Sequence, residues 1–172
     1  MKTFWLVAGV LLLPVPALAL DAGAPVRAVM AAAEANWSDQ PGEYQDYFSK
    51  ERLATLYSAG FVALYRAASD TPFAREAGTP FDWDVIVNAQ DGCPLQNLSV
   101  TPSGREGDAT LVSARFQNMT CFGTDPEYQA YSEATFVVVE EDGRAVIDDI
   151  VQTMDGERLS LSAQMREIAG QQ

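Results

Sequence analysis

Residues 81–93 read FDWDVIVNAQDGC, and here the hydrophobic pattern changes from a period of 3.6 residues to a period of two. Within this stretch Trp83, Val85 and Val87 alternate with Asp84, Ile86 and Asn88, and Asp84 falls on the opposite side from Trp83. Such alternation is typical of a half-buried β-strand. We therefore expect the chain to be helical before residue 81 and to form strands after it.

Two amphipathic helices are expected in the first half. The first spans residues 25–37, and the second spans about 50–68 with Ser49 as its N-cap. The loop expected over residues 69–80 contains two prolines and a glycine. The predicted apolar faces consist of Val26, Val29, Met30, Ala33 and Trp37 in the first helix, and Leu53, Leu56, Tyr57, Gly60, Phe61, Leu64 and Ala68 in the second.

The second half predicts strands joined by turns. Beyond the first strand, at 81–88, the expected strands cover residues 95–101, 109–118, 128–140 and 144–152, and Asp142-Gly143 is a hairpin turn signal. A last amphipathic helix is expected over residues 157–169. This order predicts one α+β domain, residues 20–172, with helices packed on a curved, mostly antiparallel sheet of four to five strands. Such a sheet and its helices can enclose a pocket.

The first nineteen residues read as a secretory signal peptide. Lys2 supplies the positive charge, residues 4–13 are apolar, and Ala17-Leu18-Ala19 fits a cleavage site. The alternative, a membrane anchor, needs about 20 apolar residues. We expect cleavage near Ala19 and a periplasmic or secreted chain without a membrane span.

Cysteine and histidine usage restricts the chemistry. Cys93 and Cys121 are the two cysteines, and in an exported chain they predict a disulfide, the alternative being a redox or metal thiol pair. The chain has no histidine, which excludes Ser-His-Asp and Cys-His catalysis and imidazole zinc sites. No metal or cofactor is expected. The net charge of −13 disfavours nucleic acid and anionic membranes and favours a cationic partner, although acidity can serve solubility alone.

Aspartates in the central stretch are the remaining candidates for chemistry. Asp82 and Asp84 share one face of the expected strand and Asp91 follows at a turn, but their spacing matches no calcium loop. They are interpreted first as solvated or capping groups, and a general base would need Asp84 inside an apolar pocket. Of Asp148 and Asp149, the inward one is expected to be a hydrogen-bonded structural carboxylate. The candidate ligand-binding residues are Tyr44, Tyr47, Asp82, Trp83, Asp84 and Asp91.

Three passages resemble the nuclear transport factor 2-like superfamily, and within it a family of small exported bacterial proteins of unknown function. They are Tyr-x-x-Tyr-Phe-Ser at residues 44–49, residues 81–84 with 88–91, and the closing segment 145–150. The resemblance covers residues 26–152. It implies a conical α+β fold with a cavity at its wide end, and it allows a homodimer through the sheet. Some members are isomerases, dehydratases or cyclases, and others only bind ligands, so the fold leaves function open.

Three functional hypotheses follow. The first is a non-enzymatic, exported binding or protein-interaction domain for an unknown protein or small-molecule partner, one specific form being an acidic protein that neutralises a basic partner. The second is a small isomerase or lyase that uses a buried aspartate in the cone. The third is a structural accessory of the cell envelope, with the outer sheet face or the C-terminal segment as its contact surface, which an exposed apolar patch on the sheet would favour.

Overall fold

The computed structural model describes residues 20–154 and 156–170, so the expected signal segment with Lys2 and Ala19 lies outside the described residues. Within them the chain forms five helices and one five-stranded antiparallel sheet, which confirms the α+β class. No helix of this described part is long and apolar enough to cross a membrane. The elements are α1 (Gly23–Asn36), α2 (Lys50–Leu56), α3 (Ala59–Ser69), α4 (Pro72–Ala77), β1 (Gln96–Glu106), β2 (Ala109–Gln117), β3 (Ser132–Glu141), β4 (Arg144–Met154), β5 (Glu157–Ser160) and α5 (Leu161–Gly170).

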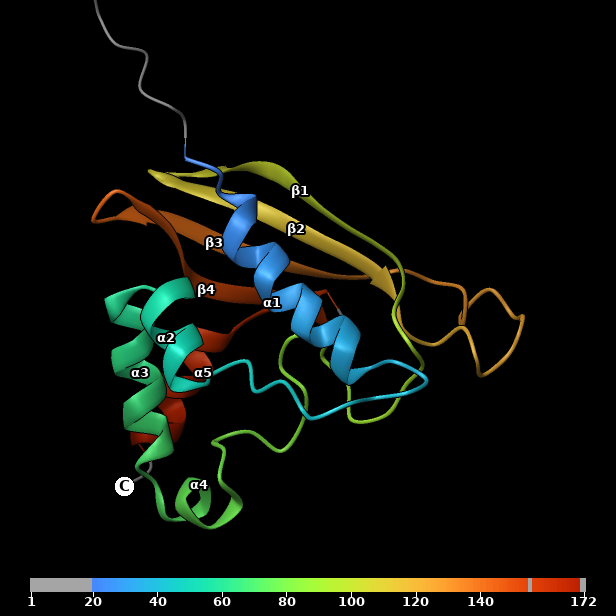
Figure 1. Ribbon diagram of the computed structural model, residues 1–172, viewed down its shortest axis with the longest axis horizontal. Coiled ribbons are helices and arrows are strands. Elements are labelled where there is room, and N and C mark those ends of the chain that lie inside the picture. The colour runs from blue at the N-terminus through green and yellow to red at the C-terminus, as the bar shows by residue number, and fades with distance from the viewer. Residues whose placement is uncertain (1–19, 155, 171–172) are drawn as a thin grey trace, which may run out of the picture.

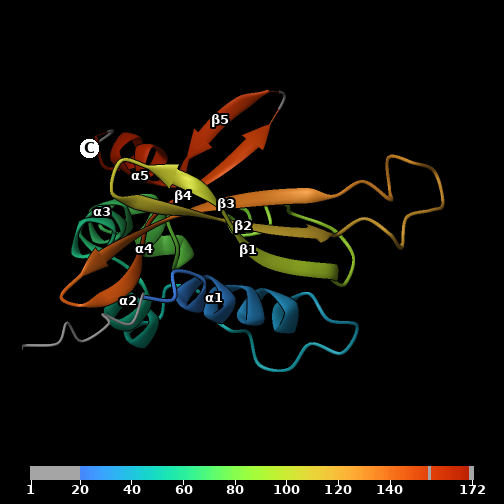
Figure 2. The same ribbon diagram turned by 90° about the horizontal axis from the view of Figure 1, so that it is seen from above.

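The sheet is a meander in which each strand pairs with the next, in the order β1-β2-β3-β4-β5 (Figure 1). The predicted turn between β3 and β4 is confirmed. Asp142 and Gly143 have φ angles of 52° and 72°, and a two-residue type I′ hairpin turn requires positive φ at both positions. Helix α1 lies across the sheet and contacts β1, β2 and β4, and α5 packs on α3 and β4 (Figures 1 and 2). The sheet face toward the helices buries Val112, Ala114, Phe116, Ala134, Phe136, Val138, Ile147 and Ile150.

A bulge in β4 explains how two consecutive aspartates fit into a buried strand. Ile147 pairs with Val138 and Ile150 with Phe136, so both isoleucines face the helices although two residues separate them. The extra residue is Asp148. Its Oδ1 accepts a hydrogen bond from the Ser58 hydroxyl at 2.6 Å, while Asp149 accepts from Ser160 and from the backbone amide of Ser162 in α5. Both carboxylates therefore join strands to helices.

The single helix predicted over residues 50–68 is wrong, because the chain is extended at Tyr57 and Ser58. There Tyr57 bridges to Ile147 of β4, and the Ser58 amide donates to the Ile147 carbonyl at 2.9 Å. The Ser58 side chain then caps α3 by accepting from the Phe61 amide. The contact of Tyr57 and Ser58 with β4 therefore interrupts the expected helix. As a result, α2 and α3 are two separate helices on either side of these residues. Ser49 caps α2 as expected.

Four other expectations need correction. Residues 81–88 form turns instead of a strand, and Val85, Ile86 and Val87 are all buried instead of alternating. The expected loop at 69–80 contains α4, which Thr71 caps. The final segment begins as strand β5 before it becomes α5, and β1 extends to Glu106, beyond the expected strand end at residue 101.

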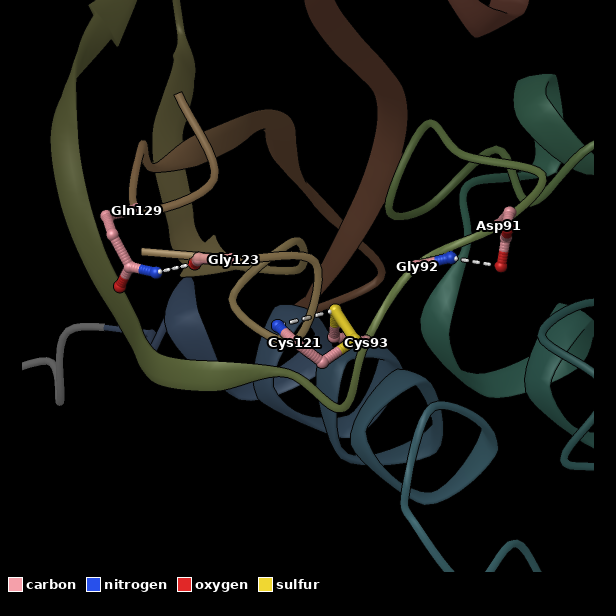
Figure 3. The surroundings of a disulfide bond; sticks show 6 residues. All are labelled: Asp91, Gly92, Cys93, Cys121, Gly123 and Gln129. Atoms are coloured by element: carbon pink, nitrogen blue, oxygen red, sulfur yellow. Dashed lines mark hydrogen bonds between the residues drawn. A yellow bond between two sulfur atoms is a disulfide. The ribbon is translucent and has the colours of Figure 1, made fainter. Parts of the chain in front are cut away.

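The predicted disulfide is confirmed. Cys93 and Cys121 are joined, with their Cα atoms 5.7 Å apart, and the Cys121 amide lies 2.9 Å from the Cys93 sulfur (Figure 3). The bond ties the segment before β1 to the loop after β2. In Figures 1 and 2 that loop, residues 118–131, extends beyond the end of the sheet.

Candidate functional site

A cleft of about 800 Å³ lies where the C-terminal end of α1, the segment between α1 and α2, and the central stretch meet. We call it the aromatic cleft. It takes in five of the six candidate ligand-binding residues, all except Asp91. Its lining residues are Asn36, Trp37, Tyr44, Asp46, Tyr47, Phe48, Tyr65, Gly78, Thr79, Phe81, Asp82, Trp83, Asp84, Val85, Ala89 and Gln90.

The cleft differs in position from the pocket expected between the helices and the sheet. None of its lining residues belongs to a strand; they come from helices and connecting segments. The space between α1 and the sheet is occupied by fully buried side chains such as Met30, Phe116 and Phe136. In Figure 1 the cleft-forming segments, 37–49 and 78–90, run below α1.

Asp84 holds the cleft together. Its Oδ2 accepts hydrogen bonds from the indole nitrogen of Trp37 at 2.8 Å and from the hydroxyl of Tyr47 at 2.7 Å. Its Oδ1 accepts from the backbone amides of Ile86 and Val87 at 2.9 and 3.1 Å. The carboxylate thereby turns the chain at residues 84–87 and fixes two aromatic walls. All four contacts use lone pairs that a general base would need for its substrate.

The aromatic side chains of the cleft form a connected series. The Tyr44 ring meets Tyr47 edge to face with centroids 6.2 Å apart. Phe48 stacks on Tyr65 at 4.7 Å, and Phe81 lies against Trp83 at 6.0 Å. Phe48 also contacts Tyr47 and Phe81, which links the series from end to end. Tyr44 remains 66% exposed at the outer end of this series.

Negative charge surrounds the exposed rings. Asp46, Asp82 and Asp84 line the cleft, and its lining includes no lysine or arginine. Partial burial raises the pKa of the Tyr44 phenol, and the Asp84 and Asp46 carboxylates raise it further. Burial raises the pKa of Tyr47 more strongly, with the neighbouring Asp84 as the second cause. The nearby Arg52 donates to the Asp46 carbonyl and the Gln45 side chain.

Asp82 is the carboxylate best placed to meet a ligand. It is exposed, and within the described part of the chain its carboxylate has no hydrogen-bond or ion-pair partner. Asp46 is also exposed, but its Oδ1 accepts from the Phe48 amide. Among the residues that the structure describes, no three His, Cys, Asp or Glu side chains gather as metal ligands would.

Asp91 lies outside the cleft. Its Oδ1 accepts from the adjacent Gly92 amide at 2.8 Å, beside the disulfide (Figure 3). Gly92 itself matters to the cleft, because a Cβ placed there would come within 2.6 Å of the Trp37 ring and 2.8 Å of the Asn118 carbonyl oxygen. Only glycine leaves room for Trp37 to reach Asp84 in this position.

Sequence reasoning missed several residues of the cleft. Trp37 was expected only as a core residue of the first helix, and Phe48, Tyr65 and Phe81 carried no local signal for a site. Comparison with known proteins adds nothing to this geometry: no family model, no curated protein and no solved structure matches the chain.

Proposed function

We propose that this protein is an exported, non-enzymatic binding domain that engages a positively charged protein partner through the aromatic cleft. The composition of the cleft wall supports the proposal best: seven aromatic side chains and three aspartates line it, without a lysine or arginine among them. Aromatic faces and carboxylates both attract cations. Membership of the nuclear transport factor 2-like superfamily remains part of this proposal.

The charge of the whole chain supports the same partner class. With a net charge of −13, the protein attracts basic proteins over long range and repels acidic ones. Such attraction is screened beyond about 8 Å at physiological ionic strength. The net charge therefore draws a basic partner toward the protein, and the cleft must supply the specific contacts.

The test uses the immobilised full chain to capture proteins from a bacterial envelope extract at low and at high salt. The proposal expects basic proteins that are bound at low salt and lost at high salt. The cleft variant Asp82→Asn/Tyr44→Leu should capture less of them. Its matched control, Asp91→Asn/Phe122→Leu, replaces an aspartate and an aromatic residue in the same way at exposed positions outside the cleft lining and should capture them normally. Capture that is equal at both salt levels, or equal for both variants, contradicts the proposal.

The geometry gives less support to an isomerase or lyase. That hypothesis needs a buried carboxylate with a lone pair free for the substrate. Asp84 is partly buried but accepts four hydrogen bonds, and Asp82 has a free carboxylate but is exposed. We therefore propose binding without chemistry.

A further inference from the structure

We infer that the aromatic cleft is a binding site for an organic cation, the guanidinium or alkylammonium head of a basic side chain, seated against Tyr44 and Trp83 with Asp82 as its counter-ion. This inference rests on the proposed function and specifies what the cleft recognises. The class of ligand follows from three independent features of the wall.

The first feature is the exposed aromatic surface. Tyr44 is 66% exposed and Trp83 is partly exposed, and both line the same cleft. An isolated exposed ring is ordinary, but here each ring contacts a second aromatic ring edge to face, Tyr44 that of Tyr47 and Trp83 that of Phe81. Such contacts restrict the rings before a ligand arrives, which reduces the side-chain entropy that is lost on binding. Trp and Tyr faces are the surfaces that attract ammonium and guanidinium groups most strongly.

The second feature is the uncompensated charge. Asp84 is already satisfied by Trp37, Tyr47 and two amides, so its charge is fixed in place and does not move to meet a ligand. Asp82 has no partner among the described residues and is free to pair with an incoming cation. Burial is the main cause that raises the pKa of the Tyr44 phenol, and the Asp84 and Asp46 carboxylates raise it further because they oppose its ionisation. A field that opposes an anion at this point favours a cation there.

The third feature is the size of the cleft. Its volume of about 800 Å³ exceeds what one head group needs and leaves room for the apolar stem of a lysine or arginine side chain along Phe48 and Phe81. Small inorganic cations would gain nothing from those rings. Neutral apolar ligands would leave Asp82 without a counter-ion.

The experiment follows the indole NH signals of Trp37 and Trp83 by NMR during titration with N-acetyl-arginine amide. The control probe is N-acetyl-citrulline amide, which has the same shape but an uncharged head. We expect saturable shifts with the arginine probe, centred on Trp83, and none with the citrulline probe. Tyr44→Leu should weaken binding by about 3- to 30-fold, the range of one cation–π contact, and Asp82→Asn should weaken it too. Phe122→Leu and Asp91→Asn should leave it unchanged.

Equal binding of the citrulline probe, unchanged binding in both cleft variants, or the absence of saturable shifts in the folded wild type overturns the inference. A second arm separates it from the proposed function by titrating an arginine-rich peptide. If the peptide binds and the cleft variants do not weaken it, the cation site is wrong while a basic partner stands. If the single-residue probe binds in the cleft and the peptide does not, the cation site stands and the basic protein partner is wrong.

Discussion

Replacing Asp84 by asparagine tests whether this carboxylate holds the cleft together. In the wild type its two oxygens accept four hydrogen bonds, from Trp37, Tyr47 and the amides of Ile86 and Val87, at 2.7 to 3.1 Å. Asparagine offers one oxygen and one NH₂ group in the same shape. If the oxygen keeps the two amides, the NH₂ group faces Trp37 and Tyr47.

The two aromatic partners respond differently to that NH₂ group. The hydroxyl of Tyr47 can rotate and accept from it, whereas the indole NH of Trp37 can only donate. One donor therefore loses its acceptor, and an unsatisfied buried donor costs about 1–3 kcal/mol on top of the weaker, uncharged hydrogen bonds. Because Asp84 is only partly buried, water replaces some of the loss. We expect Asp84→Asn to lower the free energy of unfolding by about 2–3 kcal/mol, or Tm by roughly 5–10 °C.

Urea unfolding measures this loss, with Asp91→Asn as the matched control. Asp91 is exposed and bonds only its own neighbour, so its substitution should stay within about 0.5 kcal/mol of the wild type. A double-mutant cycle with Trp37→Phe should give a coupling energy of about 1–2 kcal/mol, because the phenylalanine removes the orphaned donor. The reasoning is refuted if Asp84→Asn matches the control, or if the cycle is additive within about 0.5 kcal/mol.

Three further predictions concern stability. Replacing both Cys93 and Cys121 by alanine opens a loop with a sequence separation of 28 residues and should cost about 3–4 kcal/mol in the chain-entropy model; unfolding curves that coincide with the wild type would contradict this. Ser58→Ala removes a helix cap and a hydrogen bond to the β4 bulge, so it should lower the free energy of unfolding by about 2–3 kcal/mol. The control Ser49→Ala removes only the cap of α2 and should lower it by about 1 kcal/mol. Similar losses for the two variants would show that the contact with β4 contributes nothing. Burial raises the pKa of Tyr57 in the folded protein, so the unfolded chain loses the phenol proton at a lower pH than the folded chain does. Stability should therefore fall as the pH rises above about 10, and the fall should be smaller in Tyr57→Phe. Parallel profiles of stability against pH for the two proteins would exclude Tyr57 as a cause.

The sequence predicted those parts of the fold that local chemistry determines. The turn at Asp142-Gly143 needs positive φ at both positions, and the Ser49 hydroxyl serves its own helix, so each could be read from adjacent residues. The helix break at Tyr57 could not, because the partner that stabilises the extended backbone is Ile147, 90 residues away. Only the folded sheet offers that partner.

The central stretch shows why alternation alone misled. The pattern of Trp83, Val85 and Val87 is that of a strand, but the Asp84 carboxylate bonds the two amides that a neighbouring strand would otherwise need. The stretch therefore turns on itself. Residue type did direct attention to five of the residues that line the cleft, which are Tyr44, Tyr47, Asp82, Trp83 and Asp84. The rings of Phe48 and Tyr65, which also line it, come together only through tertiary packing.

The close approach of Gly92 to Trp37 has a consequence for how this architecture can vary. The indole occupies the space where any other residue at position 92 would place its first side-chain carbon, and the Asn118 carbonyl closes the other side. A related chain with a larger residue at 92 must therefore carry a smaller ring, or none, at 37, and must also hold the backbone at 118 farther away. That ring also donates to Asp84, so three positions separated by up to 55 residues are expected to co-vary as one unit in any homologous sequences.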